Sequence, residues 1–292
     1  MTAVLGGDLR ARLARLDFVL RRSLTGTLRG DRRAPRRKGI SLEFADFRAY
    51  APGDDVRHLD WASLARLDQL LIRLYHDEEE LNLNLVIDMS RSMAYGTPPK
   101  RELAIGLAAA LAWIGRIRGH RVETWLLGEE LEHAEPGASA GAFEAFLDRL
   151  EAMPATSTRP LIEHLDQLRL RTRLRGLTVL ISDLFEPAGP RAVLKRLLGP
   201  RRSLDILQIL APEELEPDLE GDLLLEDMET GEAVEITWTK ALAEIYRRRL
   251  TGHLASWAEA ARRRGAAWTH LSSRLTLEDA VLNELAPKGW LA

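Results

Sequence analysis

The sequence predicts an α/β protein whose central sheet is largely parallel and is covered by helices on both faces. From about residue 81 onward, short apolar segments alternate with helical segments of ten or more residues, which is typical of such sheets. Two of the apolar segments, 81–88 and 177–183, each end in an aspartate. Because the carboxyl ends of parallel strands meet at one sheet edge, where open α/β folds bind ligands, these aspartates predict a functional site.

The composition is that of a globular protein. The chain has 292 residues, of which 46% are hydrophobic and 29% are charged, a length that allows one large domain or one domain with a smaller module. The absence of cysteine excludes disulfides, thiolate chemistry and cysteine-based zinc sites. No apolar run approaches the roughly 18 residues of a membrane helix, and Arg10, Arg12 and Arg15 interrupt any signal-peptide pattern. We therefore expect a cytoplasmic location.

Charge is distributed unevenly along the chain. Residues 1–38 hold 11 Lys or Arg against three acids, a net charge of +8, whereas the rest of the chain carries −11. Leucines at spacings of three and four predict a helix over 8–29, and a basic arm over 32–38 follows it. The arm could bind nucleic acid. The acidic chain and the lack of interleaved aromatic residues favour a solvated linker instead.

Residues 39–61 mix charges of both signs with apolar residues more densely than an ordinary surface loop does. We expect a partly buried ion-pair network there that pins the segment to the main domain, with Tyr50 and Trp61 packed across it. The charged members of this network are Glu43, Arg48, Asp54, Arg57 and Asp60. The predicted organisation is a basic N-terminal helix and arm over 1–38, a segment over 39–80 packed on the main domain, and the main domain over 81–292.

The remaining elements follow from periodicity and turn residues. Lys100 to Arg118 is predicted as a strong helix, and Lys240 to Arg264 as a long arginine-rich helix closed by Gly265. A hairpin insertion is expected over 221–237. The other predicted helices are 63–68, 143–150, 161–170, 190–198 and 277–285, and the other predicted strands are 70–75, 122–127, 129–134, 203–210 and 267–271.

The candidate site begins where the first strand of the main domain ends. Asp88 is followed at intervals of two residues by Ser90 and Ser92, so one carboxylate and two hydroxyls can turn toward one point. Oxygen ligands of this kind suit a hard divalent cation such as Mg²⁺. The right-handed crossover rule brings Asp183 to the same crevice. Acids and serines are also common in ordinary turns, so the pattern alone is not specific.

Residues 81–183 resemble a von Willebrand factor A domain. In that family a metal-ion-dependent adhesion site uses Asp-x-Ser-x-Ser after the first strand, a threonine in a later loop and an aspartate after a following strand. Thr158 is the first choice for the threonine and Thr156 the second, although Thr158 could equally be the N-cap of the next helix. The resemblance implies that Mg²⁺ or Mn²⁺ is held by Asp88, Ser90, Ser92, Thr158 and Asp183.

Residues 39–75 resemble the signature block of the domain of unknown function 58 family, whose pattern runs roughly Gly-x-Gly-x-Glu-Phe, Arg-x-Tyr, Pro-Gly-Asp-Asp and Arg-x-x-Asp-Trp. Ser41 departs from this pattern by replacing the second glycine. With the A domain behind it, the resemblance covers about residues 39–275. The matching residues are Gly39, Glu43, Phe44, Arg48, Tyr50, Pro52, Gly53, Asp54, Asp55, Arg57, Asp60 and Trp61.

The family resemblance implies a partner. Such proteins typically accompany MoxR-type AAA+ ATPases of bacteria, which are thought to act as chaperones for maturing complexes or enzymes. This chain has no Gly-x-x-x-x-Gly-Lys-Ser/Thr loop, so it is not itself predicted to be the ATPase. Many members of the family carry a membrane anchor, and we expect none in this sequence.

We expect a binding module rather than an enzyme. A cation held by hydroxyl ligands stays electron-poor and can take a Glu or Asp of a partner as its last ligand. A metal-free site, in which the same residues only tie the loops together, is the alternative. A haloacid-dehalogenase-like phosphatase also places an aspartate after its first strand. It needs a second carboxylate two residues further on, where this chain has Ser90.

Overall fold

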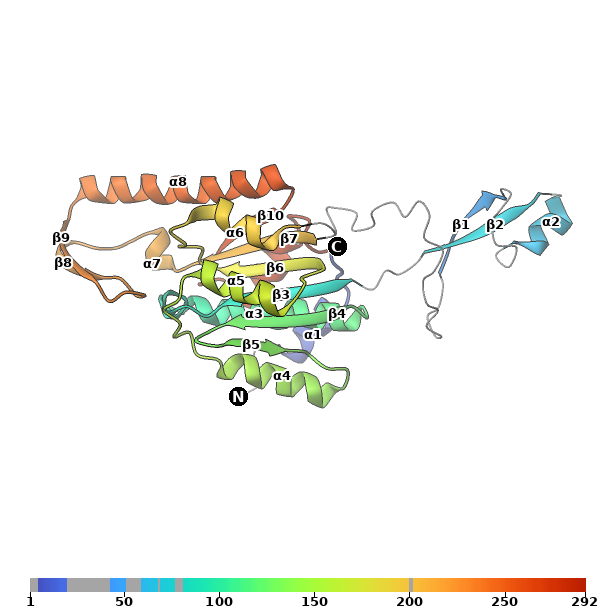
Figure 1. Cartoon of the computed structure of the whole chain (residues 1–292), viewed down its shortest axis with the longest axis horizontal. Coiled ribbons are helices and arrows are strands. Elements are labelled where there is room, and N and C mark those ends of the chain that lie inside the picture. Colours follow the sequence, from blue (N-terminus) through green and yellow to red (C-terminus); the bar gives the residue numbers. More distant parts are fainter. Residues whose placement is uncertain (1–4, 20–42, 51–58, 68, 77–80, 200–201) are drawn as a thin grey trace. The chain divides into compact units, whose positions relative to one another are not determined.

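The computed structural model describes residues 5–19, 43–50, 59–67, 69–76, 81–199 and 202–292. By its internal contacts the chain divides into two units. One consists of Met1–Gly26 together with Leu81–Ala292, and the other of Thr27–Glu80. The larger unit contains the central sheet (Figure 1).

The strands of the central sheet in the described residues are β3 (Asn82–Asp88), β4 (Arg121–Leu127), β5 (Leu131–Ala134), β6 (Gly176–Ser182), β7 (Arg202–Leu210) and β10 (Ala267–Ser272). Their order across the sheet is β10-β7-β6-β3-β4-β5. All neighbours are parallel except β5, which runs antiparallel to β4. This is the doubly wound order with its switch point between β3 and β6. It confirms the predicted fold class and agrees with the resemblance to a von Willebrand factor A domain.

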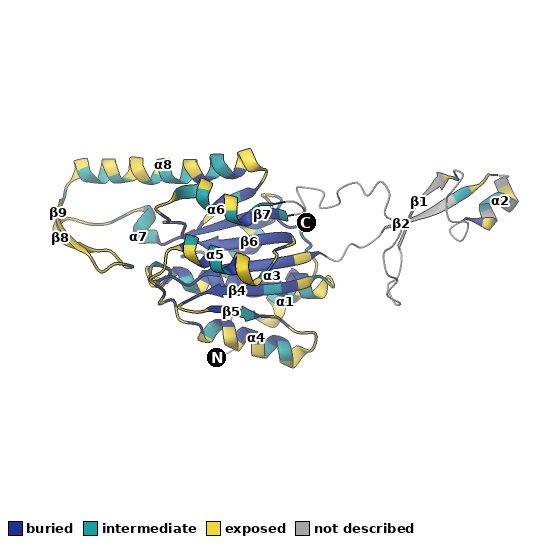
Figure 2. Ribbon diagram, viewed as in Figure 1, coloured by how far each residue is buried: buried dark blue, intermediate teal, exposed yellow. Residues whose placement is uncertain are grey.

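Helices cover both faces of this sheet (Figures 1 and 2). One face is covered by α3 (Lys100–Ile117), α4 (Ala140–Ala152), the short helix α1 (Gly7–Leu13) and the π-helical turn η3 (Asp279–Leu285). The other face is covered by α5 (Leu161–Arg171), α6 (Gly189–Leu197) and α8 (Lys240–Arg264). Each face has its own apolar core, and β6 is buried along its whole length. Burial on both sides explains why the central strands carry apolar residues on both of their faces.

Local signals set the ends of the helices. The Oγ of Ser139 accepts a hydrogen bond from Ala142 N at 3.1 Å at the start of α4, and the Oγ1 of Thr239 accepts one from Leu242 N at 3.2 Å at the start of α8. At the far end of α8, Gly265 has a φ of 65°, in the left-handed region that glycine adopts without steric cost. The helix predicted from Lys240 to Arg264 is confirmed.

The N-terminal segment differs from the prediction. The periodicity predicts a helix over 8–29, but α1 ends at Leu13. Beyond it the chain pairs with the C-terminal segment: Asp17 N donates to Ala292 O at 2.8 Å, and Ala292 N donates to Asp17 O at 2.9 Å. A continued helix would lose these bonds, so tertiary contacts override the local pattern here. The predicted basic arm over 32–38 lies outside the described residues.

Between β7 and α8 the chain forms the short helix α7 (Pro212–Leu215) and an antiparallel hairpin of β8 (Gly221–Glu226) and β9 (Ala233–Trp238). The hairpin prediction is therefore confirmed. Most residues of both strands are exposed. At the base of the hairpin, Trp238 contacts Tyr246 of α8 with 5.9 Å between the ring centroids. Figure 1 shows the hairpin close to the beginning of α8.

The smaller unit contains β1 (Glu43–Ala49), which pairs antiparallel with β2 (Leu71–His76), and the helix α2 (Trp61–Leu67). The sequence predicts α2 and β2 but misses β1, in which acidic residues and alanines of low strand propensity outnumber the two phenylalanines. The packing of this unit on the main domain stays a prediction. Within the described residues, no helix combines the length and the apolar character needed to cross a membrane.

The structure describes only part of the expected ion-pair network. Asp60 is buried and accepts a hydrogen bond from the Oγ of Ser63 at 2.6 Å. Trp61 is 65% exposed within the described residues, and its packing across the network stays a prediction. Tyr50 is half-buried. The side chains of Glu43, Arg48, Gly53, Asp54, Asp55 and Arg57 lie outside the described residues.

Candidate functional site

The candidate site lies at the switch point of the sheet. The register aligns Ile87 of β3 with Ile181 of β6, so Asp88 and Asp183 emerge from neighbouring strands at the same sheet edge. Both aspartates are almost fully buried. The structure thus brings together the two carboxylates that the sequence predicts to share one crevice.

Asp88 is held by two hydrogen bonds. Its Oδ1 accepts from the backbone N of Ser90 at 2.9 Å, and its Oδ2 accepts from the Oγ of Ser182 at 2.6 Å. Burial raises the pKa of Asp88 to about 6, and the negative charge of Asp183 adds to the rise. The hydrogen bonds from Ser182 and Ser90 oppose this rise without cancelling it. A nearby cation would therefore favour the charged form of Asp88.

The two predicted serines follow in the 3-10 turn η2 (Arg91–Ala94) and at its N-cap. The Oγ atoms of Ser90 and Ser92 lie 3.1 Å apart, so the two hydroxyls face the same point. The backbone N of Ser92 donates at 3.1 Å to Oε1 of Glu229, a residue of the β8–β9 hairpin. Both serines lie beside Asp88 as the sequence predicts, whereas no sequence pattern predicts the contact of Glu229.

Thr158 lies in the loop that leads into α5. The loop is anchored to the site because Ser157 N donates to Met89 O at 3.1 Å and Arg91 N donates to Ser157 O at 2.9 Å. The buried Oγ of Ser157 also forms a hydrogen bond with Nε2 of His164 at 2.9 Å. Thr158 is exposed and lines the cavity described below. The N-cap of α5 is Pro160, so the interpretation of Thr158 as that cap is wrong.

Thr156, the second choice for the threonine, is exposed and does not line the cavity. The structure therefore favours Thr158 over Thr156.

A strained turn directs Asp183. Leu184, the next residue, has a φ of 62°, a left-handed conformation that costs a leucine roughly 1–3 kcal/mol. The turn lets Phe185 N donate to Oδ1 of Asp183 at 3.3 Å and Leu184 N donate to the Oγ of Ser182 at 3.0 Å. Such strain is often concentrated at functional sites, where it fixes side chains for binding.

A buried lysine stands behind Asp183. The Nζ of Lys100, at the start of α3, donates to Oδ2 of Asp183 at 2.7 Å and to Oε1 of Glu214 at 2.6 Å. Lys100 is completely buried. Burial alone would lower the pKa of Lys100, but the carboxylates of Asp183 and Glu214 outweigh it and raise the pKa above its usual value. Lys100 therefore supplies a permanent positive charge at the edge of the site.

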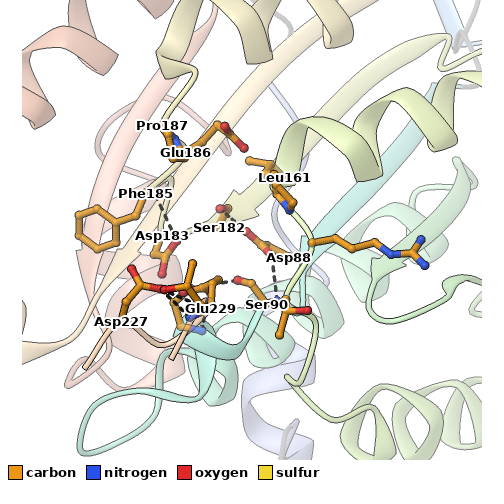
Figure 3. A pocket seen from close by; sticks show the side chains of 15 residues that line it. Asp88, Ser90, Leu161, Ser182, Asp183, Phe185, Glu186, Pro187, Asp227 and Glu229 are labelled. Atoms are coloured by element: carbon orange, nitrogen blue, oxygen red, sulfur yellow. Dashed lines mark hydrogen bonds between the residues drawn. The ribbon is translucent and has the colours of Figure 1, made fainter. Parts of the chain in front are cut away.

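A cavity of about 210 Å³ lies beside Asp88 and Asp183 (Figure 3). The cavity is lined mostly by residues that follow β3 and β6, by the loop before α5, and by the tip of the β8–β9 hairpin. Its polar lining residues include Asp88, Ser90, Ser92, Thr158, Ser182, Asp183, Glu186, Asp227, Glu229 and Thr230. All five of the predicted metal ligands line it.

The donor set fits a hard divalent cation. Within the described residues, no three His, Cys, Asp or Glu side chains cluster so as to hold a metal ion, so a cation here would depend on hydroxyl oxygens as well. Asp88 and the hydroxyls of Ser90, Ser92 and Thr158 supply such oxygens. Burial and, after it, the charge of Asp183 raise the pKa of Asp88, and a cation beside the carboxylate would oppose both effects. Asp183 is less available, because Lys100 already engages it.

The charged residues that contact the predicted site residues are not predicted from the sequence. Lys100 carries one weak signal: a cation at the N-terminus of a helix opposes the helix dipole and needs a compensating partner. Glu214 and Glu229 belong to an acidic stretch and carry no individual signal. They reach the site only because the insertion between β7 and α8 folds back over the sheet edge.

The fold and the cavity together define a class: an α/β protein with a doubly wound sheet and a cavity of carboxylates and hydroxyls at its switch point. The chain belongs to the family described as "Protein of unknown function DUF58", whose model matches residues 46–256. It is 32% identical over 265 residues to an uncharacterized protein of Mycobacterium tuberculosis and to one of Mycobacterium bovis, matches that cover 88% of this chain and 83% of each relative. The family predicted from the signature block is confirmed.

Solved structures with partial likeness include BatB from Bacteroides thetaiotaomicron (13% identity, TM-score 0.41) and an aerotolerance-related membrane protein from Bacteroides fragilis (14% identity, TM-score 0.42). Each match covers 71% of this chain, and 98% and 99% of those chains respectively. The manganese-loaded TRAP protein of Plasmodium vivax matches at 15% identity and a TM-score of 0.33, over 45% of this chain and 57% of its own. Likeness at these scores carries no functional argument.

Proposed function

We propose that this chain is a non-enzymatic protein-binding module whose cavity holds Mg²⁺ or Mn²⁺. The observation that carries the proposal is the convergence of Asp88, Ser90, Ser92 and Thr158 on one cavity at the switch point. A bound cation supplies an electropositive point that attracts a Glu or Asp side chain of a partner. The chain's own hydroxyls would hold the cation without neutralising it, and Asp88 would provide the charged ligand.

A metal-free interaction site is the second candidate. The ion pair of Lys100 with Asp183 favours it, because Lys100 already places a positive charge beside one of the two carboxylates. Lys100 is fully buried and also paired with Glu214, so it cannot itself contact a partner. It can only reduce the need for a cation. The two candidates therefore differ in whether partner capture depends on a divalent ion.

The experiment that tests the proposal measures Mn²⁺ uptake by electron paramagnetic resonance in the wild type, Asp88→Ala and the control Asp218→Ala. Asp218 is an exposed acid that does not line the cavity. We expect Asp88→Ala to weaken Mn²⁺ binding by at least about tenfold while the thermal unfolding midpoint stays within a few degrees. Equal Mn²⁺ affinity in all three proteins would overturn the metal role.

We further propose that the partner is a MoxR-type AAA+ ATPase or its client, a step that rests on the family resemblance alone. The test is a pull-down of the purified ATPase with the purified chain in Mg²⁺ and in EDTA. Loss of capture both in EDTA and in Asp88→Ala supports a metal-mediated contact. Capture that is equal in Mg²⁺ and EDTA supports the metal-free candidate, and no capture in either contradicts this partner.

The absence of phosphatase chemistry is part of the proposal. Ser90 stands where that chemistry needs a second carboxylate, and a serine hydroxyl cannot act as that general acid and base. We expect no hydrolysis of p-nitrophenyl phosphate above the rate of Asp88→Asn. Hydrolysis that disappears in Asp88→Asn would contradict the non-enzymatic assignment.

A further inference from the structure

The tip of the β8–β9 hairpin reaches the candidate site, and the proposed function does not use it. Asp227, Glu229 and Thr230 line the same cavity as Asp88 and Ser90. Figure 3 shows the Asp227 and Glu229 side chains at the edge of the cavity near Ser90. The rest of the hairpin is largely exposed, but Glu229 is half-buried and its Oε1 accepts the hydrogen bond from Ser92 N at 3.1 Å.

The tip is ordered by its own hydrogen bonds. Oδ1 of Asp227 accepts from Glu229 N at 3.0 Å, from Thr230 N at 2.7 Å and from the Oγ1 of Thr230 at 3.0 Å. Gly231 closes the turn with a φ of 72°. This arrangement is a side-chain-stabilised turn, in which an aspartate replaces a backbone acceptor. It holds the backbone of Glu229 in place and directs the Glu229 side chain inward.

The position of Glu229 is electrostatically unusual. The stretch from Pro212 to Thr239 contains 11 acidic residues and no basic one, and acids in such a stretch normally point toward solvent. Glu229 instead turns its carboxylate toward a cavity that already holds Asp88 and Asp183. The bond to Ser92 N offsets part of the repulsion. A glutamate carboxylate in this place has the chemistry and the location that the proposed function assigns to a partner.

We propose that Glu229 is an internal carboxylate ligand that occupies the place of the partner's acidic side chain, so that the hairpin must withdraw before a partner can bind. This inference rests on the proposed function. Because Glu229 is tethered, it competes at an effective concentration in the millimolar range. If the closed arrangement holds about 90% of the molecules, an external carboxylate binds about tenfold more weakly than to an open site.

The experiment compares the wild type with Glu229→Ala and with Glu232→Ala. Glu232 lies in the same turn, and its replacement removes the same charge, but its side chain does not line the cavity. The probe is a fluorescent blocked peptide, Gly-Gly-Glu-Gly-Gly, titrated in Mg²⁺, and its glutamine analogue controls for the carboxylate. A second, metal-free measurement follows hydrogen exchange of the Ser92 amide by NMR in EDTA.

We expect Glu229→Ala to bind the glutamate peptide about tenfold more tightly than the wild type or Glu232→Ala, with no gain for the glutamine peptide. In EDTA the Ser92 amide should exchange at least about tenfold faster in Glu229→Ala alone. Equal peptide affinity in all three proteins, with Mn²⁺ uptake intact, would overturn the inference and leave the proposed function standing.

The two failures can be told apart. If none of the proteins takes up Mn²⁺ or peptide, the proposed metal-dependent function fails. The Ser92 exchange rate then tests the hairpin contact by itself. If the Ser92 amide exchanges at the same rate in Glu229→Ala as in the wild type, Glu229 does not close the site. If it exchanges faster in Glu229→Ala, Glu229 closes a site that works without a metal.

Discussion

Lys100 sets the charge around Asp183, because its ammonium group is paired with both Asp183 and Glu214. We predict that Lys100→Met lowers the free energy of unfolding by about 3–5 kcal/mol in EDTA, because it leaves Asp183 and Glu214 buried without a positive partner. Mg²⁺ should restore part of the loss, since a cation can replace the missing charge. The measurement is chemical denaturation with and without Mg²⁺.

The control for this prediction is Lys195→Met, a change of the same chemistry at an exposed position of α6. Its effect should stay within about 0.5 kcal/mol in both conditions. A Lys100→Met protein that is destabilised but gains nothing from Mg²⁺ would contradict the compensation and favour the metal-free candidate.

Asp88 gives the site a pH dependence. Its folded pKa, raised to about 6 by burial and by the charge of Asp183, exceeds the usual value for an aspartate, so the folded state binds its proton more tightly than the unfolded state. The stabilising contribution is then fully present below pH about 4 and is lost as the pH rises through about 6. In EDTA, the unfolding free energy of the wild type should therefore fall over this range relative to that of Asp88→Asn.

This difference in unfolding free energy is at most about 2–3 kcal/mol, because the pKa of Asp88 is raised from 3.8 to about 6. Denaturation curves at several pH values between 4 and 7.5 measure it, and the comparison of the two proteins removes the contribution of other acids. Parallel curves for the wild type and Asp88→Asn would contradict the raised pKa.

The sequence predicts which oxygen-bearing residues line this site, but it does not predict which charged residues surround them. Asp88, Ser90 and Ser92 follow from a local spacing, and Asp183 follows from the same strand-then-acid pattern. Lys100, Glu214 and Glu229 act on the site through contacts that span 83 to 137 positions in sequence. No local pattern specifies contacts of that kind, because they depend on how separate elements pack.

At the scale of elements, the loop before α5 positions Thr158. Ser157 anchors that loop through its backbone to Met89 and Arg91 and through its side chain to His164. We predict that Ser157→Ala destabilises the protein by about 1–3 kcal/mol, because it leaves the Nε2 of buried His164 without this partner. It should also weaken Mn²⁺ binding, because Thr158 is then held less firmly.

Thr156→Ala is the matched control in the same loop, since Thr156 is exposed and lies away from the cavity. Isothermal titration with Mn²⁺ and thermal unfolding, applied to Ser157→Ala, Thr156→Ala and a third variant, Thr158→Ala, separate binding from stability. If Thr156→Ala weakens Mn²⁺ binding more than Ser157→Ala and Thr158→Ala do, the assignment of Thr158 is wrong.

Element prediction succeeds where the local signals and the packing agree. The helix α8 has a threonine cap, a clear periodicity and a terminal glycine, and its observed bounds equal the predicted ones. The strand β1 is missed because its acidic and small residues have weak strand propensity, and its pairing with β2 supplies what propensity lacks. The helix predicted over 8–29 fails for the opposite reason: a good helical pattern yields to pairing with the C-terminal segment.

At the scale of the whole molecule, that pairing changes where the main domain begins. The sequence assigns residues 1–38 to a separate helix and arm, but the described residues 5–19 pack against the domain that starts at Leu81. Leu13 is fully buried in the same core as α3 and η3, and Leu5 is nearly so. The Nε1 of Trp113 in α3 donates to Arg10 O at 3.0 Å. The N-terminal segment is thus a structural part of the sheet domain.

We predict that Leu13→Ala lowers the free energy of unfolding by about 2–5 kcal/mol, as expected for a leucine removed from a packed core. Asp8→Ala, an exposed change on the same helix, should cost less than about 1 kcal/mol, the size of a helix-dipole contribution. Urea denaturation monitored by tryptophan fluorescence measures both. If Leu13→Ala costs as little as Asp8→Ala, α1 does not contribute to the core of the sheet domain. The burial of Leu13 places α1 in the core that also contains α3, the helix that begins at Lys100.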